Sequence, residues 1–296
     1  MEFLPAKTLI SKNKFPEKWF GVDYNLNLYR GCSHGCIYCD SRSSCYQIKN
    51  FDIVKSKENV HQLFRKEIKK IGSRNIIGFG AMSDTYNPME EKYEITRKAL
   101  NILSNYDCGL SIETKSNLIT RDIDLLKDIN HDNNVIIKFS ITTTDDKLAS
   151  IIEPGAPSPS KRLKAMKKVS NAGIYTGVLL QPVLPYITSS EDNILTVIKE
   201  SFQNNAKFIS SYMGMTLRER DYYFNQLDKN FLNLKQKYIN KYHNNYSCPA
   251  ENYKELCKLF ISNCEKYNLS YKMKDIISDY KIVNKIEYKQ STLNNF

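Results

Sequence analysis

The sequence predicts an α/β protein with a parallel sheet covered by helices. From about residue 22 to residue 213, six β-rich segments alternate with amphipathic stretches. In those stretches the apolar residues recur every three or four positions, as they do on one face of a helix. Such alternation is typical of strand–helix–strand units and a parallel sheet. Six units in about 190 residues suit either a doubly wound sheet or a barrel-like arc.

The predicted strands are short runs rich in apolar and β-branched residues, at residues 22–29, 75–79, 109–114, 135–142, 174–180 and 207–212. The predicted helices occupy residues 59–71, 90–103, 120–129, 160–172 and 190–202. The fourth of these helices is expected to end at Gly173, since glycine commonly follows the last helical residue. In parallel sheets of either type, functional residues gather at the carboxyl ends of the strands.

Length and composition indicate an ordinary globular chain. It has 296 residues, of which 41% are hydrophobic and 25% charged, and a net charge of +11. That charge permits a polyanionic partner without requiring one. No signal peptide is expected, and the most apolar run, residues 177–187, is interrupted by Gln181, Pro182 and Pro185. We therefore expect a cytoplasmic protein without a membrane span. In that reducing compartment, clustered cysteines more often bind metal or take part in redox chemistry than form disulfides, and this chain has eight cysteines.

Three regions are expected along the chain. Residues 1–21 form an N-terminal segment that packs on the barrel or sheet, residues 22–214 form the β/α body, and residues 215–296 form a mainly helical extension. The extension has 14 basic and 9 acidic residues, a net charge of +5, and predicted helices at residues 218–242 and 252–267. Its cysteines are expected to pack as small apolar residues, with a second metal cluster as the alternative.

The segment NLYRGCSHGCIYCD holds Cys32, Cys36 and Cys39 in the spacing C-x3-C-x2-C, directly after the first predicted strand. Thiolates at such close spacing suit an iron–sulfur cluster or zinc. Three cysteines leave one iron of a four-iron cluster open, as catalytic metal sites keep one position for substrate. Two alternatives remain. The cysteines bind no metal, or a fourth protein ligand closes a structural site, the candidates being Cys45, His34 and Asp40.

The spacing, together with Tyr38 before the third cysteine, resembles the radical S-adenosylmethionine (radical SAM) enzymes. The strings GAMSDTYNPME, ETKSNLITRDIDLL and EPGAPSPSKR resemble the branch related to spore photoproduct lyase, often called DNA-repair-photolyase-like, over about residues 5–285. The resemblance implies a partial (β/α)6 barrel with a C-terminal helical extension. It further implies that Cys32, Cys36 and Cys39 hold a [4Fe–4S] cluster whose open iron binds S-adenosylmethionine.

In this family, an electron from a donor such as flavodoxin or ferredoxin passes through the cluster and cleaves S-adenosylmethionine. The resulting 5′-deoxyadenosyl radical abstracts hydrogen from the substrate. The cofactors supply this chemistry, and the protein supplies orientation and exclusion of side reactions.

The expected cofactor-binding residues follow the predicted strands. Ser83 and Asp84, after the second strand, would accept hydrogen bonds from the ammonium of the cofactor's methionine part. Lys115, after the third strand, would pair with its carboxylate. Ser140 and Thr142, at the end of the fourth strand, would reach the ribose hydroxyls. The family resemblance implies cofactor contacts for the positions of Ser83, Lys115 and Ser140, and an ordinary solvated side chain is the alternative for Lys115 and Ser140.

Four further residues are candidates. Glu153 and Arg162, on either side of the PGAPSPS loop, would form a polar clamp on the cofactor, with an internal ion pair or helix cap as the alternative. Tyr38 and Cys45 are candidate catalytic residues. Cys45 would line the same pocket and quench a radical, and a plain buried thiol is the alternative.

Two departures from spore photoproduct lyase bear on the reaction. That enzyme has a hydrogen-donating cysteine where this chain has Ala81, next to Met82, which carries no thiol. It also has a tyrosine where this chain has Asp40. Thymine-dimer repair through that cysteine is therefore not expected.

The leading interpretation is a radical SAM enzyme that acts on modified or damaged nucleic acid. The alternatives are radical modification of a peptide or metabolite, and a non-catalytic nucleic-acid-binding protein with a structural zinc or iron–sulfur site. Gln290, Leu293 and Phe296 resemble a replication-clamp peptide of the form Q-x-x-L-x-x-F, for which an ordinary chain terminus is the alternative.

Overall fold

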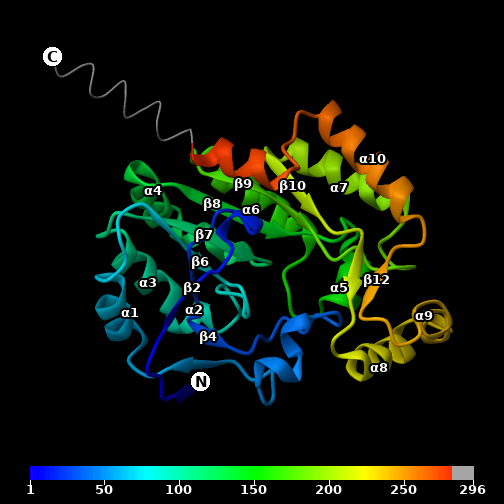
Figure 1. Ribbon diagram of the computed structural model, residues 1–296, viewed down its shortest axis with the longest axis horizontal. Helices are drawn as coiled ribbons and strands as arrows, with labels where there is room; N and C mark the ends of the chain where they lie inside the picture. The colour runs from blue at the N-terminus through cyan, green and yellow to red at the C-terminus, as the bar shows by residue number, and fades with distance from the viewer. Residues whose placement is uncertain (282–296) are drawn as a thin grey trace.

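Six parallel strands form the central sheet of the computed structural model, which describes residues 1–281 (Figure 1). They are β3 (Tyr24–Leu26), β6 (Asn75–Phe79), β7 (Cys108–Thr114), β8 (Val135–Ser140), β9 (Tyr175–Leu180) and β10 (Phe208–Ser211). Each strand pairs with the next one along the chain, so the order never reverses. A doubly wound sheet requires such a reversal, whereas a barrel-type arc does not. The predicted α/β fold with a partial barrel is confirmed.

Helices connect these strands and cover the outer face of the sheet. They are α1 (Val60–Ile68), α2 (Glu90–Tyr93), α3 (Ile95–Leu103), α4 (Ile123–Asp132), α5 (Asp146–Ile152), α6 (Pro159–Asn171) and α7 (Glu191–Gln203). The single helix expected at residues 90–103 is divided in two, because Glu94 adopts a left-handed conformation with φ 51°. Helix α5 was not predicted. A short 3-10 helix, η4 (Asn117–Asp122), precedes α4.

The N-terminal residues add strands instead of only packing on the barrel. Strand β2 (Ile10–Lys12) pairs antiparallel with β3 and forms the seventh strand of the sheet. A separate small sheet joins β1 (Glu2–Leu4), β5 (Lys55–Lys57) and β4 (Tyr29–Arg30). Three single-turn 3-10 helices complete this part, at η1 (Pro16–Lys18), η2 (Asp40–Arg42) and η3 (Ser44–Tyr46).

The C-terminal part begins with a strand pair, β11 (Gly214–Thr216) and β12 (Ser247–Pro249), so no helix directly follows the sixth strand. Between them lie α8 (Arg220–Asn230) and α9 (Leu234–Tyr242), which replace the single helix expected at residues 218–242. Helix α10 (Tyr253–Lys266) packs beside α7 (Figure 1). The replication-clamp resemblance at Gln290, Leu293 and Phe296 lies outside the described residues. None of the helices within residues 1–281 is long and apolar enough to cross a bilayer.

An apolar plug fills the concave face of the sheet at one end. Phe20 and Val22 come from the N-terminal segment, and Ile276 and Tyr280 come from the helical residues 273–281. These side chains pack against the sheet, and the Tyr280 hydroxyl donates a hydrogen bond of 2.7 Å to the carbonyl of Phe20. The plug closes the end of the arc away from the carboxyl ends of the strands, so a ligand can enter the arc from the carboxyl side.

Replacement of Ile276 by alanine tests this plug. Because the side chain is fully buried, Ile276→Ala is expected to lower the free energy of unfolding by about 2–5 kcal/mol. The same change at Ile151, which is 40% exposed on α5, should cost about 0.5 kcal/mol or less. Chemical denaturation followed by circular dichroism measures both. Equal effects of the two changes would contradict the plug.

Candidate active site

The three cysteines lie in a tight loop that follows β4. Gly31 opens the loop with φ +80°, and a side chain there would come within 2.5 Å of the Phe51 carbonyl oxygen. The Cys32 amide donates to that same oxygen at 2.8 Å. Cys32 and Cys36 are buried, and Cys39 is half-buried. Burial, together with the nearby Asp84, raises the pKa of the Cys32 thiol to about 12. Such a thiol is deprotonated only when a metal binds it.

The loop rests on the segment that carries the EPG motif. The Ile37 amide donates to the Ile152 carbonyl at 3.0 Å, and the Gly155 amide donates to the His34 carbonyl at 2.8 Å. Gly155 permits this approach because a Cβ atom there would lie 2.3 Å from the Ser33 carbonyl oxygen. Gly155 therefore helps to fix the position of the cysteine loop.

Asp84 connects the cysteine loop to the ends of β6 and β7. Its Oδ1 accepts hydrogen bonds from the Tyr86 amide at 2.9 Å and the Thr114 hydroxyl at 2.7 Å. Its Oδ2 accepts from the Lys115 amide at 2.7 Å and pairs with His34 Nε2 at 3.1 Å. Although burial alone would raise the pKa of Asp84, His34 and the other donors lower it to about 2.

A carboxylate offers about four acceptor positions, and the structure uses four on Asp84. These four contacts give Asp84 a positioning role, and its expected contact with the cofactor's ammonium stays a prediction. Ser83, its neighbour, is different, since its buried hydroxyl has no hydrogen-bond partner. Ser83 thus keeps the capacity to bind a ligand.

Glu153 and Arg162 form a buried ion pair, with Arg162 NH2 and Glu153 Oε2 separated by 2.5 Å. Arg162 also donates to the Ser140 carbonyl at 3.0 Å and to the Pro157 carbonyl at 2.7 Å. The Tyr38 hydroxyl donates to Glu153 Oε1. Both charged side chains are at most 1% exposed, so the expected clamp on the cofactor is instead an internal pair. It fixes Tyr38 and the end of β8.

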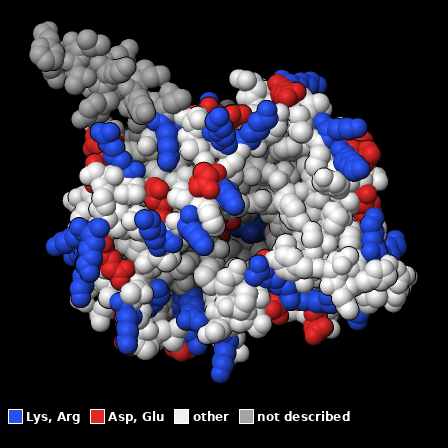
Figure 2. Space-filling view, viewed as in Figure 1, with Lys and Arg blue, Asp and Glu red and all other residues white. Residues whose placement is uncertain are grey.

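A cavity of about 400 Å³ opens beside the cysteine loop, at the carboxyl ends of β7 to β10. Figure 2 shows a hollow near the centre of the face, with blue basic atoms visible inside it. Six residues singled out in the sequence line the cavity, namely Cys36, Tyr38, Cys39, Asp40, Lys115 and Ser140. Thr142 does not line it, because its side chain is fully buried and its hydroxyl faces Glu153 at 3.5 Å.

Other cavity residues were missed, among them Trp19, Glu113, Gln181 and Tyr212. Three of them had a usable signal in the sequence. Gln181 and Tyr212 directly follow β9 and β10, and Glu113 shares the face of β7 with Lys115 because side chains alternate along a strand. Trp19 had none, since its segment is distant in the sequence from the strands that it covers.

The candidates for a fourth metal ligand are engaged elsewhere. His34 Nδ1 faces the Gly155 carbonyl at 3.1 Å and Nε2 faces Asp84 at 3.1 Å, so both ring nitrogens have partners. Asp40 pairs with Arg218 at 3.3 Å. Cys45 is exposed and contacts Ser43 and Arg218. It was expected to line the cavity, but it lies outside the lining. Within residues 1–281, no three His, Cys, Asp or Glu side chains converge on a point that would hold one metal ion.

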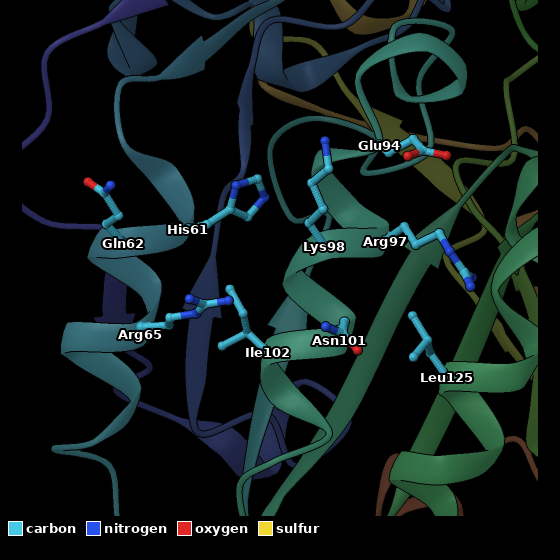
Figure 3. Close-up of a pocket in the computed structure, with 9 residues that line it drawn as sticks. All are labelled: His61, Gln62, Arg65, Glu94, Arg97, Lys98, Asn101, Ile102 and Leu125. Atoms are coloured by element: carbon cyan, nitrogen blue, oxygen red, sulfur yellow. The ribbon is translucent and has the colours of Figure 1, made fainter.

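A second pocket, of about 350 Å³, lies between α1 and α3 on the outer surface (Figure 3). His61, Arg65, Arg97 and Lys98 make it basic. In Figure 3, however, Lys98 and Arg97 point in different directions. Arg97 is already paired with Asp122 and Asp124, at 2.9 and 2.7 Å. The basic side chains of this pocket do not converge on a common point, as they would in a binding site.

A loop of three cysteines, two of which line an open cavity on the carboxyl edge of a β/α arc, is the arrangement expected for a four-iron cluster with one open iron. In a cluster of this type each cysteine binds a different iron, so the thiols need not converge on one point. Lys115 and Ser140, which line the same cavity, suit a zwitterionic cofactor.

Comparison with known proteins agrees with this class. The family model of the radical SAM superfamily matches residues 26–198, and the chain belongs to that superfamily. Its cofactors are a [4Fe–4S] cluster and S-adenosylmethionine, and members of the superfamily require a reductant.

Among its relatives is protein MJ0683 of Methanocaldococcus jannaschii, which is 34% identical over 193 residues, or 64% of this chain and 69% of that protein. Protein Rv2578c of Mycobacterium tuberculosis is 31% identical over 58% of this chain, and the match spans only 52% of its length. Spore photoproduct lyase complexed with a dinucleoside spore photoproduct has a similar fold. The TM-score is 0.66 at 17% identity, over 88% of this chain and 77% of that one.

Gly155→Ala tests the support of the cysteine loop. The added methyl group would overlap the Ser33 carbonyl and displace the loop, so iron content after anaerobic reconstitution is expected to fall at least several-fold. Gly72→Ala is the matched control, because its Cβ would lie 3.4 Å from the nearest side-chain atom. Full iron binding by Gly155→Ala would contradict the role assigned to this glycine.

Proposed function

We propose that this radical SAM enzyme abstracts hydrogen from a modified or damaged nucleic acid. The observation that carries the proposal is the cavity that places Cys36 and Cys39 opposite Lys115 and Ser140. The net charge of +11 and the fold shared with a lyase that binds a dinucleoside photoproduct support nucleic acid as the substrate class. A small electron-transfer protein such as flavodoxin or ferredoxin is the proposed reductant.

In this proposal the chain's own residues bind and orient the cofactors. Cys32, Cys36 and Cys39 hold the cluster, which when bound supplies the electron that cleaves S-adenosylmethionine to a 5′-deoxyadenosyl radical. The Lys115 ammonium pairs with the methionine carboxylate, and a charge-assisted bond of this kind is stronger than a neutral one. Lys115 Nζ also lies 5.7 Å from the centre of the Tyr38 ring, so Tyr38 limits its movement.

Ser83 and Ser140 are proposed to complete the cofactor site. The Ser83 hydroxyl is buried without a hydrogen-bond partner. A ligand that supplies the missing hydrogen bond would remove the cost of that unsatisfied group, which makes the free energy of binding more favourable. Ser140 lines the cavity at the end of β8, where Arg162 holds its carbonyl. Tyr38 is proposed as a positioning residue that links the cysteine loop to Glu153.

The hydrogen donor distinguishes this proposal from thymine-dimer repair. Among the described residues that line the cavity, the thiols belong to Cys36 and Cys39, which are assigned to the cluster. Ala81 carries no thiol, and Cys45 lies outside the cavity. We therefore propose that no protein thiol returns hydrogen to the product in this enzyme.

Formation of 5′-deoxyadenosine tests the chemistry. The protein is purified without oxygen, reconstituted with iron and sulfide, reduced, and given S-adenosylmethionine together with damaged DNA oligonucleotides. Wild type should form 5′-deoxyadenosine, Cys36→Ala should form none, and Cys45→Ala should match wild type. A colourless, zinc-loaded protein that loses its metal in Cys45→Ala would instead favour the non-catalytic binding protein.

Lys115→Met tests the cofactor site without turnover. Loss of a hydrogen-bonded charge partner costs about 1.5–3 kcal/mol, so the dissociation constant for S-adenosylmethionine should rise about 10- to 100-fold. Equilibrium dialysis of the reconstituted protein measures it. Lys98→Met, an exposed lysine on α3, is the matched control and should leave the constant unchanged. Wild-type affinity in Lys115→Met would exclude the proposed pairing.

A further inference from the structure

An aromatic groove continues from the active-site cavity across the C-terminal part. It measures about 560 Å³ and is lined by residues from β10 and its following turn, β12, α10 and the segment after α10. Its rings are Tyr212, Tyr253, Phe260 and Tyr271. Tyr212 also lines the active-site cavity, so the two hollows share a wall. We call this surface the aromatic groove.

Two of the four rings of this groove are largely exposed to solvent. Tyr253 is 46% exposed and Tyr212 is 41% exposed. Contiguous exposed apolar surface on a protein commonly marks a binding site. The Tyr212 hydroxyl bonds to Ser247 Oγ at 3.0 Å and the Tyr271 hydroxyl donates to Glu265 at 3.0 Å. These two bonds hold the rings in place, so little conformational freedom would be lost when a ligand binds.

We propose that the aromatic groove binds the nucleotides that flank the reacting one in a single-stranded or unpaired stretch of nucleic acid. The proposal rests on the proposed function and adds where the rest of the substrate lies. A reacting base inside the cavity leaves its neighbour beside Tyr212, at the start of the groove. Planar rings that stack on aromatic side chains are the usual basis of single-strand binding without sequence preference.

The charge beside the groove agrees with this occupant. Lys272 Nζ lies 5.4 Å from the centre of the Tyr271 ring, and Lys254 and Lys258 belong to α10, the helix that contributes Tyr253 and Phe260 to the groove. Ammonium groups beside stacked bases neutralise the phosphates that connect those bases. An apolar peptide would contact the rings but would carry no negative charge to pair with these lysines.

The test uses the full-length reconstituted protein and a fluorescein-labelled oligothymidylate of eight nucleotides, with binding followed by anisotropy at low salt. Tyr253→Ala is expected to raise the dissociation constant about tenfold, the loss of one stacked base. Tyr253→Phe keeps the ring and should retain wild-type affinity. Tyr186→Ala is the matched control, because Tyr186 is 37% exposed and lies outside the groove.

Each outcome decides the proposal. Wild-type affinity in Tyr253→Ala, with normal binding by the parent, would remove the groove from the binding surface and leave the nucleic-acid substrate standing. No binding of the oligonucleotide by wild type would overturn the groove proposal together with the proposed substrate class. Binding of an apolar peptide that Tyr253→Ala abolishes, while oligonucleotide binding persists, would assign the groove to a peptide. Retention of 5′-deoxyadenosine formation in all variants separates these results from damage to the cluster.

Discussion

The carboxylate of Asp84 is the contact on which the rest of the site depends. It accepts hydrogen bonds from the ends of β6 and β7 and pairs with His34 of the cysteine loop. Its side chain is only 8% exposed, and a buried charge is stable only when it is fully paired. Any displacement of the loop would leave this charge unpaired, so the energetic cost of misplacing the cysteines is far larger than the loop's own few hydrogen bonds suggest. The Asp84 carboxylate thus couples the position of the cysteine loop to the ends of β6 and β7.

A second buried contact, the pair of Glu153 and Arg162, acts on the opposite wall of the site. It joins the EPG motif, the end of β8 and Tyr38. Together with Asp84 and His34 it forms the buried charged contacts beside the cavity. Ser83, which lies after the end of β6, has a buried hydroxyl without a hydrogen-bond partner. Polar groups that lack partners in an otherwise satisfied shell are those with the most to gain from a ligand.

The sequence was sufficient for features with local causes. The six parallel strands and most helices follow from the local pattern of apolar residues. The loop of the three cysteines is predicted from their spacing alone. Features with distant causes could not be read. Strand β2 is a short, largely exposed segment without a pattern, and its role depends on β3 beside it. The partners of Asp84 lie 2 to 50 residues away in the chain, so the sequence showed a plausible ligand where the structure has a positioning residue. Likewise, nothing in the spacing of Glu153 and Arg162 distinguishes an internal ion pair from a clamp on the cofactor.

The division between cavity and groove also explains how one site can combine reactivity with affinity. The cavity must limit side reactions around a radical, and its lining includes the buried residues Cys36, Ser140 and Met215. A substrate bound only there would have little surface to contribute to binding. The aromatic groove begins at Tyr212, where the cavity ends, and its exposed rings supply stacking surface outside the reaction zone. Binding energy gained from parts of the substrate that do not react can then hold the reacting part in position. If the proposed groove binds substrate, C-terminal residues far from the cysteines in sequence would influence which substrates reach the cavity.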